Sequence, residues 1–248
     1  MLLRDNYNER KDDVEAYVTL IKQFDARRLS HKSRLILRAN VFILLYNLIE
    51  STVANCGKEL DNECVNMTTA QIHDLTEPIV NYWLKFTLFG YLTSKGELRF
   101  KDNVNSGNVN IGTLAKKLLN PQSSLELEFD FGRGGGNLDN TVISEILNRY
   151  GIETKLPRKL YQKICRYLFN SGRGILQFIK DTRNALAHGE KSFTEFGVYS
   201  HRDIRRFSKT VFEYLDFLIG IIEDFIQNKK YLKPGVIPLV NSQDGLDD

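Results

Sequence analysis

The feature that most constrains the fold is a long run of apolar residues. Apolar side chains between residues 35 and 53 cover most of the circumference of a helix: Leu35, Ile36, Leu37, Val41, Phe42, Leu44, Leu45, Leu48, Ile49 and Val53. A helix that is apolar almost all round has to be enclosed by other elements, so it belongs at the centre of a bundle. Ser30 is a suitable N-cap, and we expect this helix to continue to about Lys58. Three polar residues interrupt it: Tyr46, Asn47 and Glu50.

Helical periodicity also dominates most of the remaining chain. Apolar residues recur three and four positions apart in several further segments, which is the spacing of one helix face. We therefore expect helices over residues 12–28, from 68–69 onwards with a kink or break that Pro78 causes near Thr76, from 139–140 onwards, over 157–169, from about 171 to 188, and over 202–230.

Residues 91–137 have a different character. They are richer in Gly, Asn and Ser, and the stretch Leu125–Phe131 alternates as L-E-L-E-F-D-F, which is the period of a half-buried strand. Leu98–Lys101 could pair with it, with a short helix over 111–119 between them. The fold class that we predict is all-α, a helical bundle with a small β-containing insertion. We assign residues 1–231 to one helical domain and residues 232–248 to a mobile C-terminal tail.

Two patterns in this insertion suggest chemistry but fit a simpler explanation. Glu126, Glu128 and Asp130 would share one strand face, as in a metal nuclease, but no Lys accompanies them at the expected spacing. A solvated strand face is the favoured interpretation. The glycine-rich run at 132–136 matches neither the dinucleotide fingerprint nor the P-loop, because no G-K-[ST] follows it.

The strongest candidate for a site is the end of the helix before Gly189, in the stretch DTRNALAHGEKSFTEFG. Gly189 occupies the position of a helix C-cap. Asn184 and His188 are four residues apart and share a face, whereas Arg183 and His188 are five apart and diverge by roughly 140°. Arg183 and His188 can converge only if Gly189 unwinds the last turn, or if a second copy of the chain supplies one of them.

An arginine, an amide and an imidazole support a narrow range of chemistry. Arg183 would stabilise charge on phosphoryl oxygens, His188 would move a proton, and Asn184 would orient either of them. This set suits phosphodiester cleavage by the ribose 2′-hydroxyl, with RNA as substrate and with no metal or cofactor. The alternative is that the spacing arises by chance in a chain with many basic residues. Glu50 is either an acceptor for Arg183 or an exposed or locally satisfied carboxylate.

Composition limits the class of protein. The formal net charge is only +3, so affinity for nucleic acid has to come from local clusters. Arg202, Arg205, Arg206 and Lys209 form such a cluster at helical spacing, and we assign Arg202, Arg205 and Arg206 to substrate binding. The alternative is a solvated helix face.

Cysteine usage and the ends of the chain bear on localisation. Cys56, Cys64 and Cys165 form no metal-ligand spacing, which indicates buried or idle thiols in a reducing compartment. We find no apolar signal region and no apolar run of membrane-spanning length. We therefore expect a cytoplasmic protein with no membrane partner.

The string RNALAHGEKSFTEFG resembles the signature of HEPN-domain proteins, and more closely a prokaryotic MAE-type branch in which R-N-x-L-A-H-G precedes S-F-x-E-x-G. LRANVFILLYNLIESTV at Leu37–Val53 and GNLDNTVISEILNRYGI at Gly136–Ile152 are also similar to that branch. The resemblance implies an all-helical ribonuclease that dimerises so that two Arg/His pairs line one cleft. It implies that Arg183 and His188 are catalytic and that Asn184 is the polar neighbour. HEPN toxins often carry Tyr two residues after the His, where this chain has Glu190.

These observations predict a metal-independent endoribonuclease of a toxin or phage-defence kind, with a cognate antitoxin or regulator as a further partner. The alternatives are a non-catalytic HEPN-like module that binds RNA, a nucleotide or a protein, and a structural helical adaptor. We expect a homodimer whose interface includes the motif helix and the loop Ser192–Gly197, with Phe193 and Phe196 as anchors. The alternative is that both phenylalanines only fix the loop to their own subunit.

Overall fold

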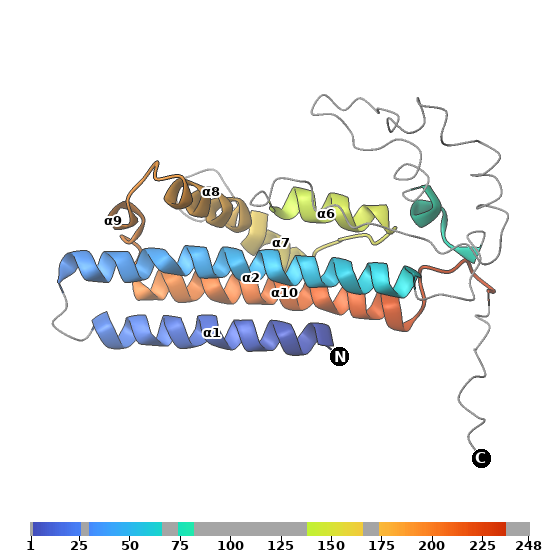
Figure 1. Ribbon diagram of the computed structural model, residues 1–248, viewed down its shortest axis with the longest axis horizontal. Helices are drawn as coiled ribbons and strands as arrows, with labels where there is room; N and C mark the ends of the chain where they lie inside the picture. Colours follow the sequence, from blue (N-terminus) through green and yellow to red (C-terminus); the bar gives the residue numbers. More distant parts are fainter. Residues whose placement is uncertain (1, 26–29, 66–73, 82–137, 166–173, 237–248) are drawn as a thin grey trace, which may run out of the picture. The chain divides into compact units, whose positions relative to one another are not determined.

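The computed structural model describes residues 2–25, 30–65, 74–81, 138–165 and 174–236 (Figure 1). These residues are predominantly helical, and none of them belongs to a β-strand. One isolated antiparallel bridge joins Leu75 to Leu232. The predicted all-α class is therefore confirmed. The insertion 91–137, with its expected strands and short helix, lies outside the described residues.

The chain divides into two compact units. The first comprises Met1–Gly57, Asp130–Ile146 and Thr154–Ile222, and the second comprises Lys58–Phe129, Leu147–Glu153 and Glu223–Asp248. The motif stretch around His188 belongs to the first unit. The predicted single helical domain over residues 1–231 stays a prediction.

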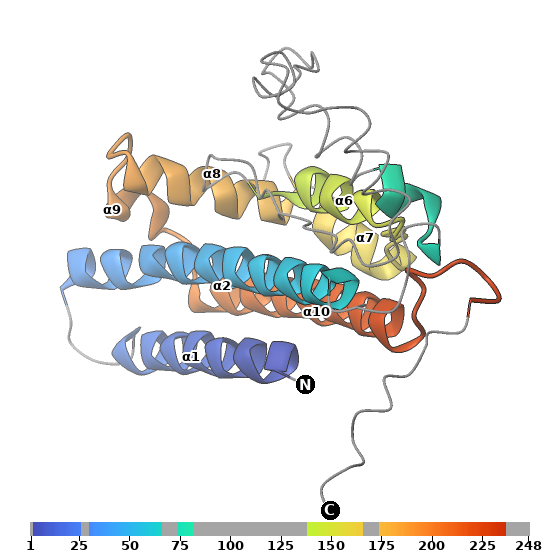
Figure 2. The same ribbon diagram turned by 45° about the vertical axis from the view of Figure 1, so that its right-hand side comes forward.

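Three long helices lie side by side in the first unit: α1 (Leu2–Asp25), α2 (His31–Val65) and α10 (His201–Gln227) (Figures 1 and 2). The residues of α2 up to Gly57 and those of α10 up to Ile222 belong to this unit. The Ser30 hydroxyl accepts the Ser33 backbone N–H at 3.1 Å, which confirms the predicted N-cap of α2. Val41, Phe42 and Leu45 on α2 are fully buried. The prediction of a central apolar helix is confirmed, and α2 extends seven residues beyond the expected Lys58.

By length and composition alone, residues 31–60 of α2 could cross a membrane, contrary to the expectation that no segment is apolar enough. Half of the most apolar window is buried inside the protein, as in the core helix of a bundle. The core helix of a helical bundle meets the same criteria of length and composition.

Helix α1 begins ten residues before the predicted start at residue 12, because Leu3 and Tyr7 continue the buried face that Val14 and Val18 define. The Tyr7 hydroxyl donates to the Phe212 carbonyl of α10 at 3.3 Å. Ion pairs tie α1 to both neighbours: Lys11 to Asp216 at 3.2 Å and Asp25 to Arg38 at 2.9 Å. These contacts explain why a helix with a mostly polar sequence is held along its length.

Four shorter helices complete the first unit: α6 (Asn140–Arg149), of which the residues up to Ile146 belong to this unit, α7 (Arg158–Cys165), α8 (Ile175–Ala187) and α9 (Phe193–Phe196). The predicted cap at residue 139 or 140 is confirmed as Asp139, whose carboxylate accepts the N–H groups of Thr141 and Val142 at 3.0 and 3.2 Å. Both views place α8 against α2, on the opposite side from α1 (Figures 1 and 2).

A cluster of four aromatic rings fixes α8 in the first unit. The four rings all contact one another, with centroids 5.4 to 5.9 Å apart. They belong to Phe42 of α2, Phe178 of α8, Phe207 of α10, and Tyr199 in the linker before α10. Most of the pairs are edge-to-face, which is the favoured geometry for aromatic quadrupoles. The cluster therefore joins three helices and the linker before α10.

In the second unit, the chain after α10 returns to residues 74–81. The Thr76 N–H donates to the Tyr231 carbonyl at 2.9 Å, and the Lys233 N–H donates to the Asp74 carbonyl at 2.8 Å. Residues 77–81 are helical, so the helix that contains Pro78 begins after Thr76 rather than passing through it. The predicted tail lies outside the described residues from residue 237 onward.

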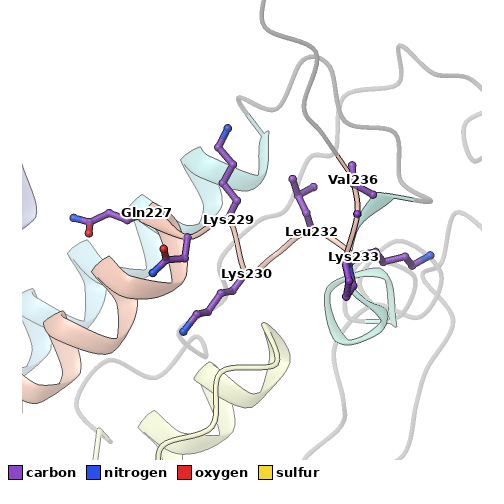
Figure 3. A pocket seen from close by; sticks show the side chains of 9 residues that line it. Gln227, Lys229, Lys230, Leu232, Lys233 and Val236 are labelled. Carbon is purple, nitrogen blue, oxygen red and sulfur yellow. The ribbon is translucent and has the colours of Figure 1, made fainter.

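This segment encloses a shallow pocket of about 400 Å³ over residues 227–236. Figure 3 shows that the side chains of Lys229, Lys230 and Lys233 splay apart rather than converge. Lys230 is paired with Asp224. The pocket does not concentrate positive charge at one point.

Candidate active site

The motif helix α8 ends in a Schellman cap. The Gly189 N–H points to the Leu186 carbonyl at 3.4 Å, and the Glu190 N–H donates to the Ala185 carbonyl at 2.9 Å. Gly189 has φ +70°, the left-handed conformation that this cap requires and that glycine adopts without strain. The sequence predicted the C-cap at Gly189, but the C-cap residue is His188, and Gly189 follows it as the left-handed residue of the cap.

His188 stands at this capped end with its side chain exposed. Its backbone remains helical at φ −86° and ψ −1°, and its N–H donates to the Asn184 carbonyl at 2.9 Å. The last turn is therefore closed, and Gly189 does not unwind it. Among the described residues, nothing bonds to the imidazole, so its orientation depends on the cap alone.

Arg183 is held differently, because it is half-buried against α2. The Cζ atom of its guanidinium lies 4.8 Å from the ring centroid of Tyr46, which is within cation–π distance. Its Nη1 donates to the Asn184 Oδ1 at 3.1 Å. A guanidinium carries five N–H donors in its plane, so stacking on one face leaves donors at the edge for a phosphate.

Asn184 connects the two predicted catalytic residues. Its side chain accepts from Arg183, and its backbone carbonyl accepts from His188 one helical turn later. The structure thus brings Arg183 and Asn184 into contact. It leaves the His188 side chain beyond them on the exposed end of the helix.

Sequence reasoning did not identify the aromatic partner of Arg183. The sequence indicated Tyr46 only as a polar residue that interrupts the central helix. It indicated Glu50 as a possible acceptor for a hydrogen bond from Arg183. In the part of the chain that the structure describes, Glu50 makes no ion pair with Arg183. Tyr46 is fully buried, and its hydroxyl accepts the Leu138 N–H at 3.2 Å. Burial raises the pKa of the Tyr46 phenol, and the Glu50 carboxylate raises it further.

A second pair holds α8 one turn before Arg183. Lys180 Nζ donates to the Asp139 carboxylate at 2.6 Å, and the side chains are only 12% and 15% exposed. Burial acts to raise the pKa of Asp139, but the bonds from Lys180 and from the N–H groups of Val142 and Thr141 outweigh it, and the pKa is lowered. The same carboxylate thus caps α6 and fixes α8.

The loop after the motif is held by one local contact and one contact with a distant part of the chain. The Glu195 carboxylate accepts the Ser192 N–H at 2.9 Å, which closes the short helix α9. Gly197 is buried against the backbone of α2, where an added Cβ would come within 2.0 Å of the Leu35 carbonyl oxygen. Only glycine allows this approach. Phe193 and Phe196 are half-buried, and Lys191 Nζ lies 5.5 Å from the Phe196 ring centroid.

Comparison with models of protein families assigns the chain to a family. Residues 2–231 match the model described as MAE_28990-like HEPN. The chain belongs to this HEPN family. No curated protein and no solved structure matches it. Membership of a HEPN family indicates a nuclease or another RNA-related module, since HEPN domains are often ribonucleases.

The residues assigned to substrate binding in this HEPN protein lie on the first turns of α10, directly after the motif loop. Arg202, Arg205 and Arg206 are all exposed. Arg205 and Lys209 also line a groove of about 570 Å³ between α1 and α10. In the described residues of that groove, Asp216 and Glu213 are paired with Lys11 and Lys163, which neutralises most of its acidic groups.

No three His, Cys, Asp or Glu side chains gather as a metal site in the described parts of the chain. Cys56 is buried, whereas the side chains of Cys64 and Cys165 lie outside the described residues. The acidic residues of the insertion, Glu126, Glu128 and Asp130, also lie outside them.

Proposed function

We propose that this HEPN protein is a metal-independent endoribonuclease of a toxin or phage-defence kind that acts in the cytoplasm. The observation that carries the proposal is the arrangement at the end of α8. A guanidinium is held in place, the described residues leave donors at its edge without a partner, and an exposed imidazole stands five residues later. Family membership supports the same conclusion.

In the proposed reaction, the ribose 2′-oxygen attacks the adjacent phosphorus. The bond from phosphorus to the 5′-oxygen breaks, and a 2′,3′-cyclic phosphate forms. The 2′-hydroxyl loses a proton to a base, and the departing 5′-oxygen gains one from an acid. Arg183 stabilises the negative charge that builds on the non-bridging oxygens. His188 is the only proton-transfer group that we assign.

Base and acid act on opposite sides of the phosphorus, because the attacking and departing oxygens are roughly in line. One imidazole cannot serve both sides in the same step. We therefore propose a homodimer in which two copies of His188 and two of Arg183 line one cleft. Support comes from the closed last turn of α8, which leaves Arg183 and His188 on separate faces of one chain.

The interface that we propose contains the loop Ser192–Gly197. Phe193 and Phe196 are only half-buried in the single chain, and Val198 beside them is 65% exposed. Half-buried aromatic residues next to an exposed aliphatic residue are suited to an isologous contact between two copies. Mixing wild-type and His188→Ala subunits tests whether the two copies of the chain share one cleft. A shared cleft predicts heterodimers with clearly less than half of the wild-type activity, whereas independent sites predict half.

The decisive experiment is cleavage of RNA by purified protein in EDTA. We expect fragments with 2′,3′-cyclic phosphate ends, no cleavage of DNA of the same sequence, and loss of cleavage in His188→Ala. Cleavage that requires a divalent ion, or that also consumes DNA, would contradict the mechanism.

The substrate path is tested separately with the α10 arginines. If Arg202, Arg205 and Arg206 contact phosphates, their triple replacement by Ala should flatten the dependence of log affinity on log salt by about 0.7 per lost contact. Replacing Arg10, Arg158 and Lys159, which are exposed basic residues elsewhere, is the matched control and should leave the slope unchanged.

The second candidate is a HEPN module that binds RNA, a nucleotide or a protein without cutting. The contacts of Arg183 with Tyr46 and Asn184 favour this candidate, because the same contacts suit an arginine with a purely structural role. RNA that is bound and never cut would select this candidate. A cognate antitoxin or regulator is a proposed partner under either reading.

A further inference from the structure

Tyr46 is a buried tyrosine of the first unit that contacts the motif helix α8 through its ring. It sits in the middle of α2, is 0% exposed, and presents its π face to a permanently charged group of α8. Tyr7, which is buried on α1, also has a cation over its ring, with Lys11 Nζ 5.4 Å from the centroid, but that lysine belongs to α1 itself. A buried aromatic face next to a guanidinium restricts the plane in which the guanidinium lies.

The ring of Tyr46 is itself fixed at its far end. Its hydroxyl accepts the Leu138 N–H at 3.2 Å, just before the cap of α6, and the next residue, Asp139, binds Lys180 of α8. The stack on Arg183 and the Lys180 pair therefore hold α8 from two sides. Burial keeps the pKa of the phenol raised, so Tyr46 stays neutral and is not a proton carrier.

We propose that Tyr46 is the positioning residue for Arg183: it orients the guanidinium so that the donors at its edge point toward the phosphate. This inference rests on the proposed ribonuclease function and assigns a role beyond the Arg183, Asn184 and His188 motif. Tyr46 acts through its ring face, and the hydroxyl only fixes the ring. The two parts of the side chain can therefore be separated by substitution.

The experiment measures kcat and KM for RNA cleavage by the full chain. Tyr46→Phe keeps the ring and loses the hydroxyl bond, and it should stay within about threefold of wild type. Tyr46→Leu removes the π face and should lower kcat by about tenfold with KM within about twofold, because a misoriented guanidinium loses transition-state contacts. Equal loss in Phe and Leu would overturn the role of the ring face.

A double-mutant cycle distinguishes positioning from a general effect on folding. In an Arg183→Ala background, measured with excess enzyme in single turnover, Tyr46→Leu should cause no further loss, since there is no guanidinium to orient. A second tenfold loss in that background would show that Tyr46 acts through the core and would overturn the proposal. If Tyr46→Leu does not fold, Tyr46→Met fills the site with an unbranched chain and enters the same cycle.

The outcomes also separate this inference from the function on which it rests. Wild-type protein that does not cleave RNA, or Arg183→Ala that cleaves as well as wild type, contradicts the proposed function and the role of Tyr46 with it. An impaired Arg183→Ala together with an active Tyr46→Leu contradicts only the role of Tyr46.

Discussion

The body of α8 and its C-terminal end carry the two halves of one motif and hold them in different ways. Arg183, in the body, is stacked on Tyr46 and bonded to Asn184, and Lys180 one turn earlier is paired with Asp139. His188, at the end, is exposed and depends on a glycine cap for its position. The group that we propose to stabilise charge is thus fixed by tertiary contacts, whereas the group that we propose to move protons is placed by local backbone geometry.

This contrast suits the different demands of the two roles. Electrostatic stabilisation is most effective when the donor is oriented before the reaction begins. Proton transfer requires an imidazole that reaches the reacting oxygen and exchanges protons with solvent between turnovers. The difference predicts that changes to the body affect stability and activity together, and that changes to the end affect activity first.

The largest expected effect comes from removing each half in turn. His188→Ala should lower kcat by about 10³-fold, a typical loss for a general acid or base, and leave the free energy of unfolding within about 0.5 kcal/mol. Arg183→Ala should lower kcat by about 10²-fold and also cost about 1 kcal/mol of stability through the lost stack and hydrogen bond. RNA cleavage and urea denaturation measure the two quantities.

His31→Ala is the matched control for this pair, because His31 is an exposed histidine at the other end of a helix of the same unit. This substitution should change neither kcat nor the free energy of unfolding. If His188→Ala lost as much stability as Arg183→Ala, the idea that the body and the end of α8 are held in different ways would be contradicted.

The next effect tests how the loop after His188 is fixed. Gly197→Ala places a Cβ 2.0 Å from the Leu35 carbonyl oxygen, so the loop has to move away from α2. We expect a loss of about 2–3 kcal/mol in the free energy of unfolding. Gly220→Ala is the control, since a Cβ there meets nothing within 4 Å and a helix interior favours alanine by up to about 1 kcal/mol. If both variants have the stability of wild type, the loop is not docked by this approach.

The ion pair between Lys180 and Asp139, which fixes the body of α8, should make the stability of the protein depend on pH. The lowered pKa of Asp139 means that its ionised form favours the folded state, so its contribution is complete above the ordinary aspartate pKa. That contribution is lost as pH falls through the lower folded pKa, below about 4. Asp139→Asn keeps the cap and loses the charge.

At pH 7 this variant should be about 1–2 kcal/mol less stable than wild type, and the gap should close in acid. Unfolding measured from pH 7 to pH 3 gives the result. A gap that is constant with pH would assign the effect to packing rather than to the Lys180 pair.

The smallest effect concerns the cap itself. Gly189→Ala adds a side chain at φ +70° with nothing within 4 Å, so its whole cost is backbone strain, about 1 kcal/mol. Gly189→Asn should cost less, because Asn tolerates the left-handed region better. Cleavage should fall in the same order, Ala more than Asn, if the cap positions His188. Equal activities would show that the imidazole finds its position without the cap.

The local features of this fold could be predicted from the sequence, because they depend on neighbouring residues. The caps at Ser30, Asp139 and Gly189 and the apolar circumference of α2 each follow from residues within one or two turns. The start of α1 was missed because only Leu3 and Tyr7 mark its first turns among polar residues.

The candidate site was predictable only as far as the helix that carries it. The order Arg183, Asn184 and His188 and their angular spacing follow from helix geometry. The stack of Arg183 on Tyr46 joins residues of two helices that are far apart in the chain, and no local pattern indicates which polar residue of α2 faces α8. The approach of Gly197 to Leu35 is hidden for the same reason.

The four-ring cluster of Phe42, Phe178, Tyr199 and Phe207 has a consequence for slow opening motions. Because one ring comes from each of α2, α8, α10 and the linker before α10, none of these segments can separate without breaking several ring contacts at once. Segments joined in this way open as one cooperative unit. The buried amides of α8 should therefore exchange with deuterium at the pace of the core of α10, while the amides of the loop between α8 and α9 exchange far sooner.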